Sequence, residues 1–334
     1  MIIPNRFLRG PILPRVQSSN VTLGLALQRK EGDNVTSPRE QFRSVLAGKI
    51  PILAANIFDP LSARIAQILE YEVYVLSGSV AKGSALNMPD LVLTNISDLV
   101  AHAQRIIQTT RVPLMVDAED GFGGPVNVVR TIADLENAGV AAIEIEDNLV
   151  PKSFGVSRPG VIPTDMHVAK LQAAISTRSD PTLTIVARTA ALGECPLDEA
   201  LHRITAYSKT GVDAIMLASV PRGQKDIEAV HSITDLPLCI LNSEISIREH
   251  RDFLIHNNVK ILMLGNPTYA ATVQTIYDVL LRLREGGTFD SLAERLASRD
   301  LLQRVIHTDE YIALQELYSK QKTIDDDRKD HAGA

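Results

Sequence analysis

The sequence predicts a (β/α)8 barrel of the TIM type with extra helices at its C-terminus. Eight short apolar, β-branched runs start about 30 residues apart, which is the length of one strand and one returning helix. The runs show little apolar–polar alternation, as expected for parallel strands covered on both faces. An open doubly wound sheet is the alternative, but the sequence has no G-x-G-x-x-G turn. The expected strands are residues 51–55, 72–76, 113–117, 141–146, 183–188, 214–218, 237–241 and 261–265.

The helices are predicted from capping residues and from amphipathic spacing. The first begins after Ser37, where Pro38 at the first helical position and Glu40 at the third complete a capping box. Gly48 ends this helix. The clearest helices between the strands are expected at residues 97–110, 125–138 and 196–210.

Both ends of the chain depart from the repeating pattern. The first 30 residues contain five basic residues and no acid, which matches a mitochondrial presequence in composition, but three prolines oppose the amphipathic helix of such a signal. An arm that packs on a neighbouring subunit is the alternative. After residue 287 two helices are expected without strands, at 290–298 and 309–320. We therefore divide the chain into an arm (1–36), a barrel (37–287), C-terminal helices open to exchange between subunits (288–323) and a charged tail (324–334).

Composition excludes several classes of protein. The 334 residues carry 34 basic against 40 acidic side chains, a net charge of −6, which argues against a general nucleic-acid binder. No run approaches the roughly 18 apolar residues of a membrane span. Cys195 and Cys239 make neither a disulfide framework nor a zinc cluster. We expect an intracellular protein, cytoplasmic or alternatively mitochondrial, that acts on a small molecule.

Carboxylates dominate the predicted ends of the strands, where a barrel of this kind has its active site. Asp117, Glu119 and Glu146 come from adjacent strands and would raise one another's pKa unless a cation neutralised them. Oxygen ligands without cysteine or histidine favour Mg²⁺, with Mn²⁺ as the alternative. Any one of these acids could instead cap a helix or pair with a basic neighbour. The three together predict a metal site.

Other polar residues at strand ends are candidates for binding a substrate. Ser77, Gly78 and Ser79 open a loop whose successive N–H groups suit an anion. Arg188 ends an apolar strand, where its guanidinium can hold a carboxylate; an ion pair with Glu146 is the alternative. Asn242 and Asn266 also follow strands and are expected to contact the substrate.

Five segments resemble the isocitrate lyase and phosphoenolpyruvate mutase superfamily of Mg²⁺-dependent barrels that act on small 2-oxo or 2-hydroxy acids. The likeness spans about residues 38 to 320, and its motifs occur in the right order on the expected strands. The segments are 58–64 (FDPLSAR), 76–79 (LSGS), 116–123 (VDAEDGFG), 144–152 (EIEDNLVPK) and 185–188 (IVAR).

The resemblance implies roles for individual residues. Asp117 matches the direct metal ligand, and Glu119, Glu146 and Asp90 match acids that act largely through water. Glu119 stands where the family usually has an aspartate. The resemblance further implies an anion cradle at 77–79, a substrate-carboxylate arginine at 188, and tetramers that exchange a C-terminal helix.

The loop after the fourth strand distinguishes the branches of the family. Here it reads PKSFGVSRPG and lacks the K-[KR]-C-G-H cysteine of the carbon–carbon lyases. Lys152 is shared with the phosphorus–carbon branch, but Phe154 replaces its asparagine. Phe154-Gly155 and the D-E-Y-x-A segment at 309–313 are closest to the oxaloacetate decarboxylase-like branch. Ser243 and Asn266 differ from the tyrosine and histidine of that branch.

These observations predict a Mg²⁺-dependent decarboxylase or related lyase for a small 2-oxo dicarboxylate such as oxaloacetate, acting through a metal-stabilised enolate. Arg188 is expected to orient the substrate, Ser77 and its neighbours to stabilise negative charge, and the Lys152 loop to exclude water. The alternatives are a phosphonopyruvate hydrolase or phosphoenolpyruvate mutase-type enzyme, a carbon–carbon lyase for a larger 2-hydroxy acid, and a non-catalytic barrel. We expect a homo-oligomer, either a tetramer or a dimer.

Overall fold

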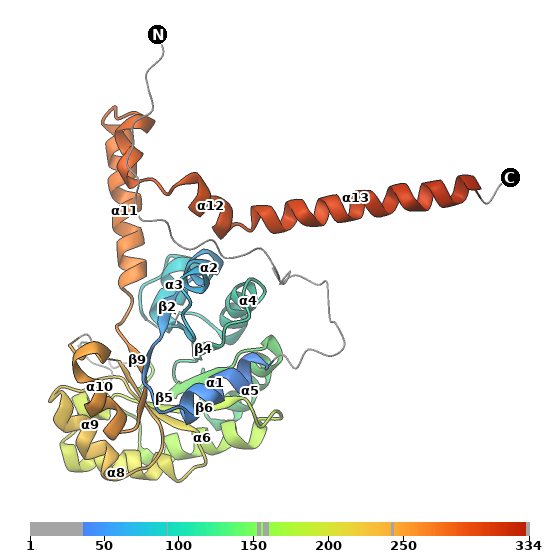
Figure 1. The fold of residues 1–334 in the computed structure, drawn as a ribbon. Coiled ribbons are helices and arrows are strands. Elements are labelled where there is room, and N and C mark those ends of the chain that lie inside the picture. Colours follow the sequence, from blue (N-terminus) through green and yellow to red (C-terminus); the bar gives the residue numbers. More distant parts are fainter. Residues whose placement is uncertain (1–35, 92, 152–154, 156–159, 242–243, 332–334) are drawn as a thin grey trace.

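The computed structural model describes residues 36–331 except 92, 152–154, 156–159 and 242–243. Its nine strands are all parallel and form one sheet in the order β1-β9-β8-β7-β6-β5-β4-β3-β2, surrounded by helices (Figure 1). This confirms the predicted barrel. The strands are β1 (Ile52–Leu53), β2 (Ala55–Ile57), β3 (Tyr74–Leu76), β4 (Leu114–Asp117), β5 (Ala142–Glu146), β6 (Thr184–Thr189), β7 (Ala214–Leu217), β8 (Leu238–Leu241) and β9 (Val259–Met263).

The seam of the barrel lies in the first predicted strand, which the structure divides into β1 and β2. β1 pairs with β9, whereas β2 pairs with β3, so residues 52–57 join the two ends of the sheet. The change of partner occurs at Ala54, whose N–H donates to the carbonyl of Leu262 at 3.0 Å, while Ala55 N–H donates to Val73 at 3.0 Å. The nine strands therefore correspond to the eight predicted ones.

The helices around the sheet begin largely where capping residues predict. The capping box at the first helix is formed: Ser37 N–H donates to Glu40 Oε2 at 2.7 Å, and Glu40 N–H donates to Ser37 Oγ at 3.2 Å. The helices are α1 (Pro38–Ala47), α2 (Pro60–Ile68), α3 (Gly78–Leu86), α4 (Ile96–Ile107), α5 (Pro125–Ala138), α6 (Thr164–Thr177), α7 (Ala191–Glu194), α8 (Leu197–Ser208), α9 (Gln224–His231) and α10 (Ile247–His256).

The core has two layers, as strand alternation requires. One lies between the sheet and the helices and contains residues such as Leu76 and Ile143. The other fills the inside of the barrel and joins Met115, Val186 and Met216 to Phe42 of α1. Because Phe42 is fully buried in this inner cluster, α1 closes the bottom of the barrel.

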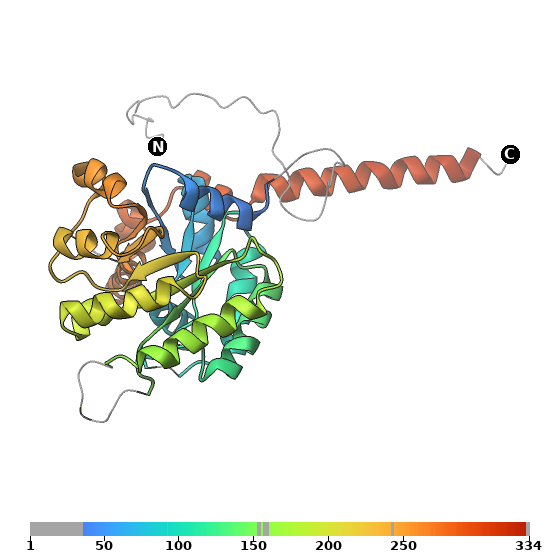
Figure 2. The ribbon, with the colours of Figure 1, turned by 90° about the horizontal axis from the view of Figure 1, so that it is seen from below.

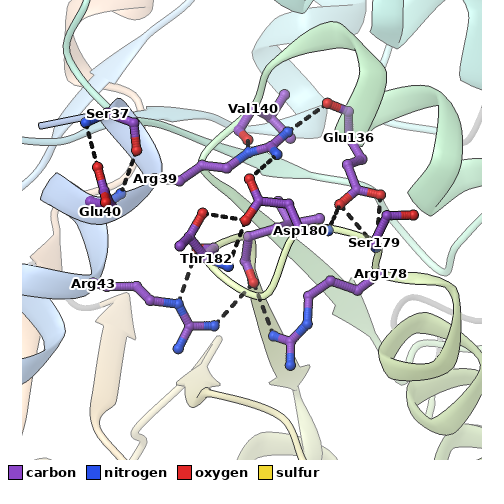
Figure 3. A network of polar contacts seen from close by, with 11 residues as sticks. Ser37, Arg39, Glu40, Arg43, Glu136, Val140, Arg178, Ser179, Asp180 and Thr182 are labelled. Carbon is purple, nitrogen blue, oxygen red and sulfur yellow. Dashed lines mark hydrogen bonds and ion pairs between the residues drawn. The ribbon is translucent and has the colours of Figure 1, made fainter.

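Ion pairs hold α1 against that bottom end (Figure 3). Arg39 Nη1 lies 2.6 Å from Asp180 Oδ2, and Arg43 Nη2 lies 2.9 Å from Asp213 Oδ1. Arg178 Nη1 contacts the other oxygen of Asp213 at 2.6 Å. The acids precede β6 and β7, so this network lies at the end of the barrel opposite the carboxyl ends of the strands.

The C-terminal helices extend away from the barrel. α11 (Pro267–Arg284) has no buried residue and projects outward (Figure 1). The helix expected at 290–298 is a 3-10 helix, η1 (Phe289–Arg295), and α12 (Arg299–Val305) follows it. The helix expected at 309–320 is α13 (Thr308–His331), which continues through most of the predicted tail; Figure 2 shows it running outward. None of the described helices is both long and apolar enough to cross a membrane.

Candidate active site

Three acids and one arginine from neighbouring strands meet inside the mouth of the barrel. Arg188 Nη1 lies 2.6 Å from Asp117 Oδ2 and 3.2 Å from Glu144 Oε2, and its Nε lies 3.3 Å from Glu146 Oε1. Asp117 ends β4, the two glutamates lie on β5, and Arg188 lies on β6. The structure therefore brings together three of the residues that the sequence singles out, and it forms the ion pair between Arg188 and Glu146.

Strand alternation explains why these side chains share the interior. Asp117 lies two residues beyond the inward-facing Met115, and Arg188 two residues beyond the inward-facing Val186. By the same rule Glu144 faces inward with Glu146, and its side chain is 1% exposed. Sequence reasoning missed Glu144 because it considered only strand ends, although the period of two was the signal that could have found it.

Asp117 is held in place by the main chain as well as by Arg188. Its Oδ2 accepts the Gly78 N–H at 3.1 Å, and its Oδ1 accepts the Glu119 N–H at 2.9 Å. Burial favours the neutral acid, but Arg188 and these two amides together hold the pKa of Asp117 below its usual value. Asp117 is thus a carboxylate in a fixed orientation.

A second cation, Lys82 of α3, pairs with the other two predicted acids. Its Nζ lies 3.0 Å from Asp90 Oδ1 and also bonds Glu119 Oε1. Lys82 is fully buried, whereas the Asp90 side chain is 67% exposed. Burial disfavours the ammonium, but the charges and hydrogen bonds of both acids outweigh it and raise the pKa of Lys82. Sequence reasoning missed Lys82, since a lysine within a helix is usually exposed.

The site contains more acid than its two cations can neutralise. Burial is the largest cause that raises the pKa of Glu119, Glu144 and Glu146, each to about 7, and the charge of Asp117 adds to it. With Asp90, five carboxylates surround Lys82 and Arg188. A net charge of −3 would remain if all five were ionised, so an additional cation would be stabilised here.

The donor set fits a hard dication. All candidate ligands are carboxylate oxygens, and Glu144 Oε1 is buried without a hydrogen-bond partner. Among the residues that the structure describes, no three Asp, Glu, His or Cys side chains form a ready-made cluster of ligands. Mg²⁺ commonly takes one or two carboxylates and keeps several waters, so such a cluster is not required.

Polar side chains from both sides of the seam line another part of the mouth. Asn266 Nδ2 donates to Ser79 Oγ at 3.1 Å and approaches Ser77 Oγ at 3.5 Å, while Asn56 Nδ2 approaches Asn266 Oδ1 at 3.4 Å. The Gly78 N–H, expected in an anion cradle, is engaged with Asp117. The predicted residues Ser77, Ser79 and Asn266 therefore form one polar group beside the acids.

The structure describes only part of the predicted site. Lys152, Phe154, Asn242 and Ser243 lie outside the described residues.

Asp147, which follows Glu146, connects the carboxyl ends of β5 and β6 through hydrogen bonds. It accepts hydrogen bonds from Thr189 Oγ1 at 2.7 Å, from Ala190 N–H at 3.1 Å and from Tyr207 OH at 3.0 Å. Burial is the main cause that raises its pKa. These bonds connect the residues that immediately follow the acids of β5 and the arginine of β6.

The fold and the site define a class of protein: closed parallel barrels whose acidic mouth suits a hard divalent cation, with an arginine among the acids. Comparison with known proteins agrees with this class. The phosphoenolpyruvate phosphomutase family matches residues 42–283, and the chain belongs to this family. The resemblance seen in the sequence is thereby confirmed.

Two curated relatives are oxaloacetate decarboxylases. The protein of Bradyrhizobium diazoefficiens is 37% identical over 270 residues, 81% of this chain and 93% of the relative. That of Chromohalobacter salexigens is 39% identical over 261 residues, 78% of this chain and 90% of the relative.

Two solved structures show the same architecture. Phosphonopyruvate hydrolase in complex with oxalate and Mg²⁺ has a TM-score of 0.76 and 25% identity, covering 84% of this chain and 99% of that one. Oxaloacetate acetylhydrolase with the inhibitor 3,3-difluorooxalacetate has a TM-score of 0.74 and 25% identity, covering 85% of this chain and 98% of that one.

Proposed function

We propose that this protein is a carbon–carbon lyase that decarboxylates a small 2-oxo dicarboxylate, with oxaloacetate as the first candidate and a divalent cation as cofactor. The observation that carries the proposal is the convergence of Asp117, Glu144 and Glu146 on Arg188 inside the barrel mouth. The oxaloacetate decarboxylase relatives, 37% and 39% identical over most of the chain, support the choice of reaction.

The metal proposed is Mg²⁺, with Mn²⁺ as the alternative. Asp117 would hold it directly, because this carboxylate is ionised, buried and fixed by two amides. Glu146, Glu119 and Asp90 would hold it through water. When bound, the metal would act as a Lewis acid that polarises the 2-oxo group of the substrate.

The remaining work falls to the residues of this chain. We propose that Arg188 turns part of its guanidinium from the acids to the substrate carboxylate, which it can bind through two parallel hydrogen bonds. The bond to the distal carboxylate then breaks, its electron pair moves toward the 2-oxo oxygen, and CO₂ leaves. The resulting enolate takes a proton from water at the carbon that carried the carboxylate, which gives pyruvate. Ser77, Ser79 and Asn266 offer hydrogen-bond donors for the charge that develops, and loss of one such donor typically costs about 3 kcal/mol of barrier.

Two further residues enter the proposal from the sequence alone, and both lie outside the described residues. We propose that Lys152 helps to exclude water from the site and that Asn242 contacts the substrate.

The direct test supplies oxaloacetate with Mg²⁺ and follows CO₂ and pyruvate, with phosphonopyruvate and phosphate release as the parallel arm. Equal amounts of CO₂ and pyruvate, absent when the metal is chelated, are the expected result. Phosphate release alone would replace the proposal by phosphonopyruvate hydrolysis, the activity named for one structural neighbour. If neither substrate turns over, calorimetry with Mg²⁺ and oxalate distinguishes the remaining classes: binding indicates a lyase for a larger 2-hydroxy acid, and no binding indicates a non-catalytic barrel.

We also propose that the protein is a homo-oligomer in which α11 packs on a second copy. The outer face of α11 exposes Val273, Ile276, Tyr277 and Leu280, each at least half accessible. An apolar groove of about 450 Å³ opens between α2 and the start of α11, where Leu61, Ile65 and Leu69 line it. Exposed apolar surface of this kind marks an interaction site.

Light scattering tests the assembly. Leu280→Glu should convert the oligomer to a monomer, because it places a charge in the proposed contact. Val126→Glu is the matched control, since Val126 is 84% exposed on α5, away from α11 and the groove. An unchanged mass of the Leu280 variant would contradict the proposal.

A further inference from the structure

Lys82 is the unusual residue of this mouth. Its side chain is completely buried, and a buried lysine is tolerated only when its charge is paired. Its ion-pair partners among the described residues are Glu119 and Asp90. Lys82 therefore pairs with the two acids of the described part of the site that form no ion pair with Arg188.

The backbone fixes the direction in which Glu119 reaches Lys82. Glu119 has a positive φ of 54°, its N–H donates to Asp117 Oδ1 at 2.9 Å, and its carbonyl accepts the Glu146 N–H at 2.8 Å. Its carboxylate passes over Gly78, where a Cβ would lie 2.1 Å from Oε1. The missing side chain at Gly78 leaves the space through which Glu119 meets Lys82.

The two cations differ in their freedom to change partners. The Arg188 side chain is 15% exposed and faces the open mouth, whereas Lys82 is enclosed. A dication held by Asp117 would lie near the charge of Lys82, which is already paired with Glu119 and Asp90. That positive charge would oppose the metal and would keep two carboxylates occupied.

We propose that Lys82 is a built-in counter-cation that lowers the metal affinity of the site, because it pairs with Glu119 and Asp90 and so competes with the water-bridged divalent cation for these two carboxylates. This inference rests on the proposed function, because it assumes a metal at Asp117. Lys82 is a positioning residue in this account: it contacts the acids and not the substrate.

The test measures Mn²⁺ dissociation constants by electron paramagnetic resonance, above about pH 8 so that the acids are ionised. Lys82→Met should bind Mn²⁺ at least tenfold more tightly than the unchanged protein, since it removes a positive charge and frees two carboxylates. Lys82→Met combined with Glu119→Gln should return to within about threefold, because one charge of each sign is then lost. Lys260→Met is the control; Lys260 donates to the Gly48 carbonyl at 2.7 Å, remote from the mouth, and should change nothing.

Each outcome decides between the explanations. If Lys82→Met binds Mn²⁺ no more tightly than the unchanged protein does, the inference about Lys82 is wrong. The proposed function is judged separately, because turnover of oxaloacetate by the unchanged protein supports it whatever the variant does. If Lys82→Met does not fold, the double variant decides: affinity near that of the unchanged protein supports the inference, and a tenfold loss indicates that Glu119 is a ligand and Lys82 merely structural. Failure of every folded variant and of the unchanged protein to bind Mn²⁺ overturns both proposals.

Discussion

The substitution Asp117→Asn isolates the charge of the central carboxylate from its shape. The asparagine oxygen can still accept one of the two amide hydrogen bonds, from Glu119 at 2.9 Å or from Gly78 at 3.1 Å. What it cannot replace is the negative charge 2.6 Å from Arg188. Arg188 keeps two other acids, Glu144 and Glu146, so the metal-free fold should survive the change.

The expected effect on metal binding follows from electrostatics. Two unit charges 4 Å apart near a protein surface interact by about 4 kcal/mol, and a dication doubles that figure, which makes about 8 kcal/mol an upper bound. Water and the neighbouring acids compensate in part. We therefore expect a loss of about 4 kcal/mol, or roughly a thousandfold in the dissociation constant. The free energy of unfolding without metal should change by less than about 2 kcal/mol, because the lost ion pair is offset by weaker repulsion between acids.

The assay combines Mn²⁺ titration, urea unfolding with a chelator present, and CO₂ release from oxaloacetate. Asp120→Asn is the matched control: Asp120 lies in the same loop, is buried, and bonds Lys170 at 3.3 Å away from the mouth. The control should keep metal affinity even if it loses stability. An Asp117→Asn protein that binds Mn²⁺ within tenfold of the unchanged one and keeps metal-dependent turnover would refute the reasoning.

Three other predictions concern stability. Arg39→Met removes the hydrogen bonds to the Val140 carbonyl and to Asp180, so urea unfolding should show a loss of about 2 kcal/mol with metal affinity unchanged. In the metal-free protein the pKa of Glu144 and that of Glu146 are each raised from the ordinary 4.5 to about 7. Between these two pH values the folded state binds more protons than the unfolded state. The free energy of unfolding should therefore fall as pH rises from about 4.5 to 7, by at most about 3 kcal/mol per group. A flat or rising profile with a chelator present would contradict this. Gly78→Ala should displace the Glu119 carboxylate from Lys82 and destabilise the fold by about 1–3 kcal/mol in thermal melts, whereas unchanged melting would show that the side chain moves freely.

The barrel was predictable because each strand is a short run of apolar residues and these runs recur at regular intervals along the sequence. Asp117, Glu146 and Arg188 were found for the same reason: a polar residue at the end of such a run lies at the mouth. The split of the first strand was not predictable, since its two halves pair with strands at opposite ends of the sequence. The local sequence pattern does not indicate which strand a given segment will pair with.

The residues missed at the site share a physical cause. Glu144 lies inside a strand and Lys82 inside a helix, where polar residues usually face solvent. Both are buried because opposite charges from other elements lie beside them, and those contacts depend on the assembled barrel. The surface that packs against α11 was also not predictable. The spacing of the apolar residues of α11 does not show whether that surface belongs to the same barrel.

The seam at residues 52–57 has a consequence for how the chain reaches its native form. β1 must meet β9, so contacts between residues about two hundred positions apart complete the ring. Ribosomes make the N-terminal part first, and the edge of β1 therefore waits unpaired until β9 has emerged. Closure is expected to be a late step, and a nascent protein stalled before β9 would present an open, adhesive edge suited to capture by chaperones.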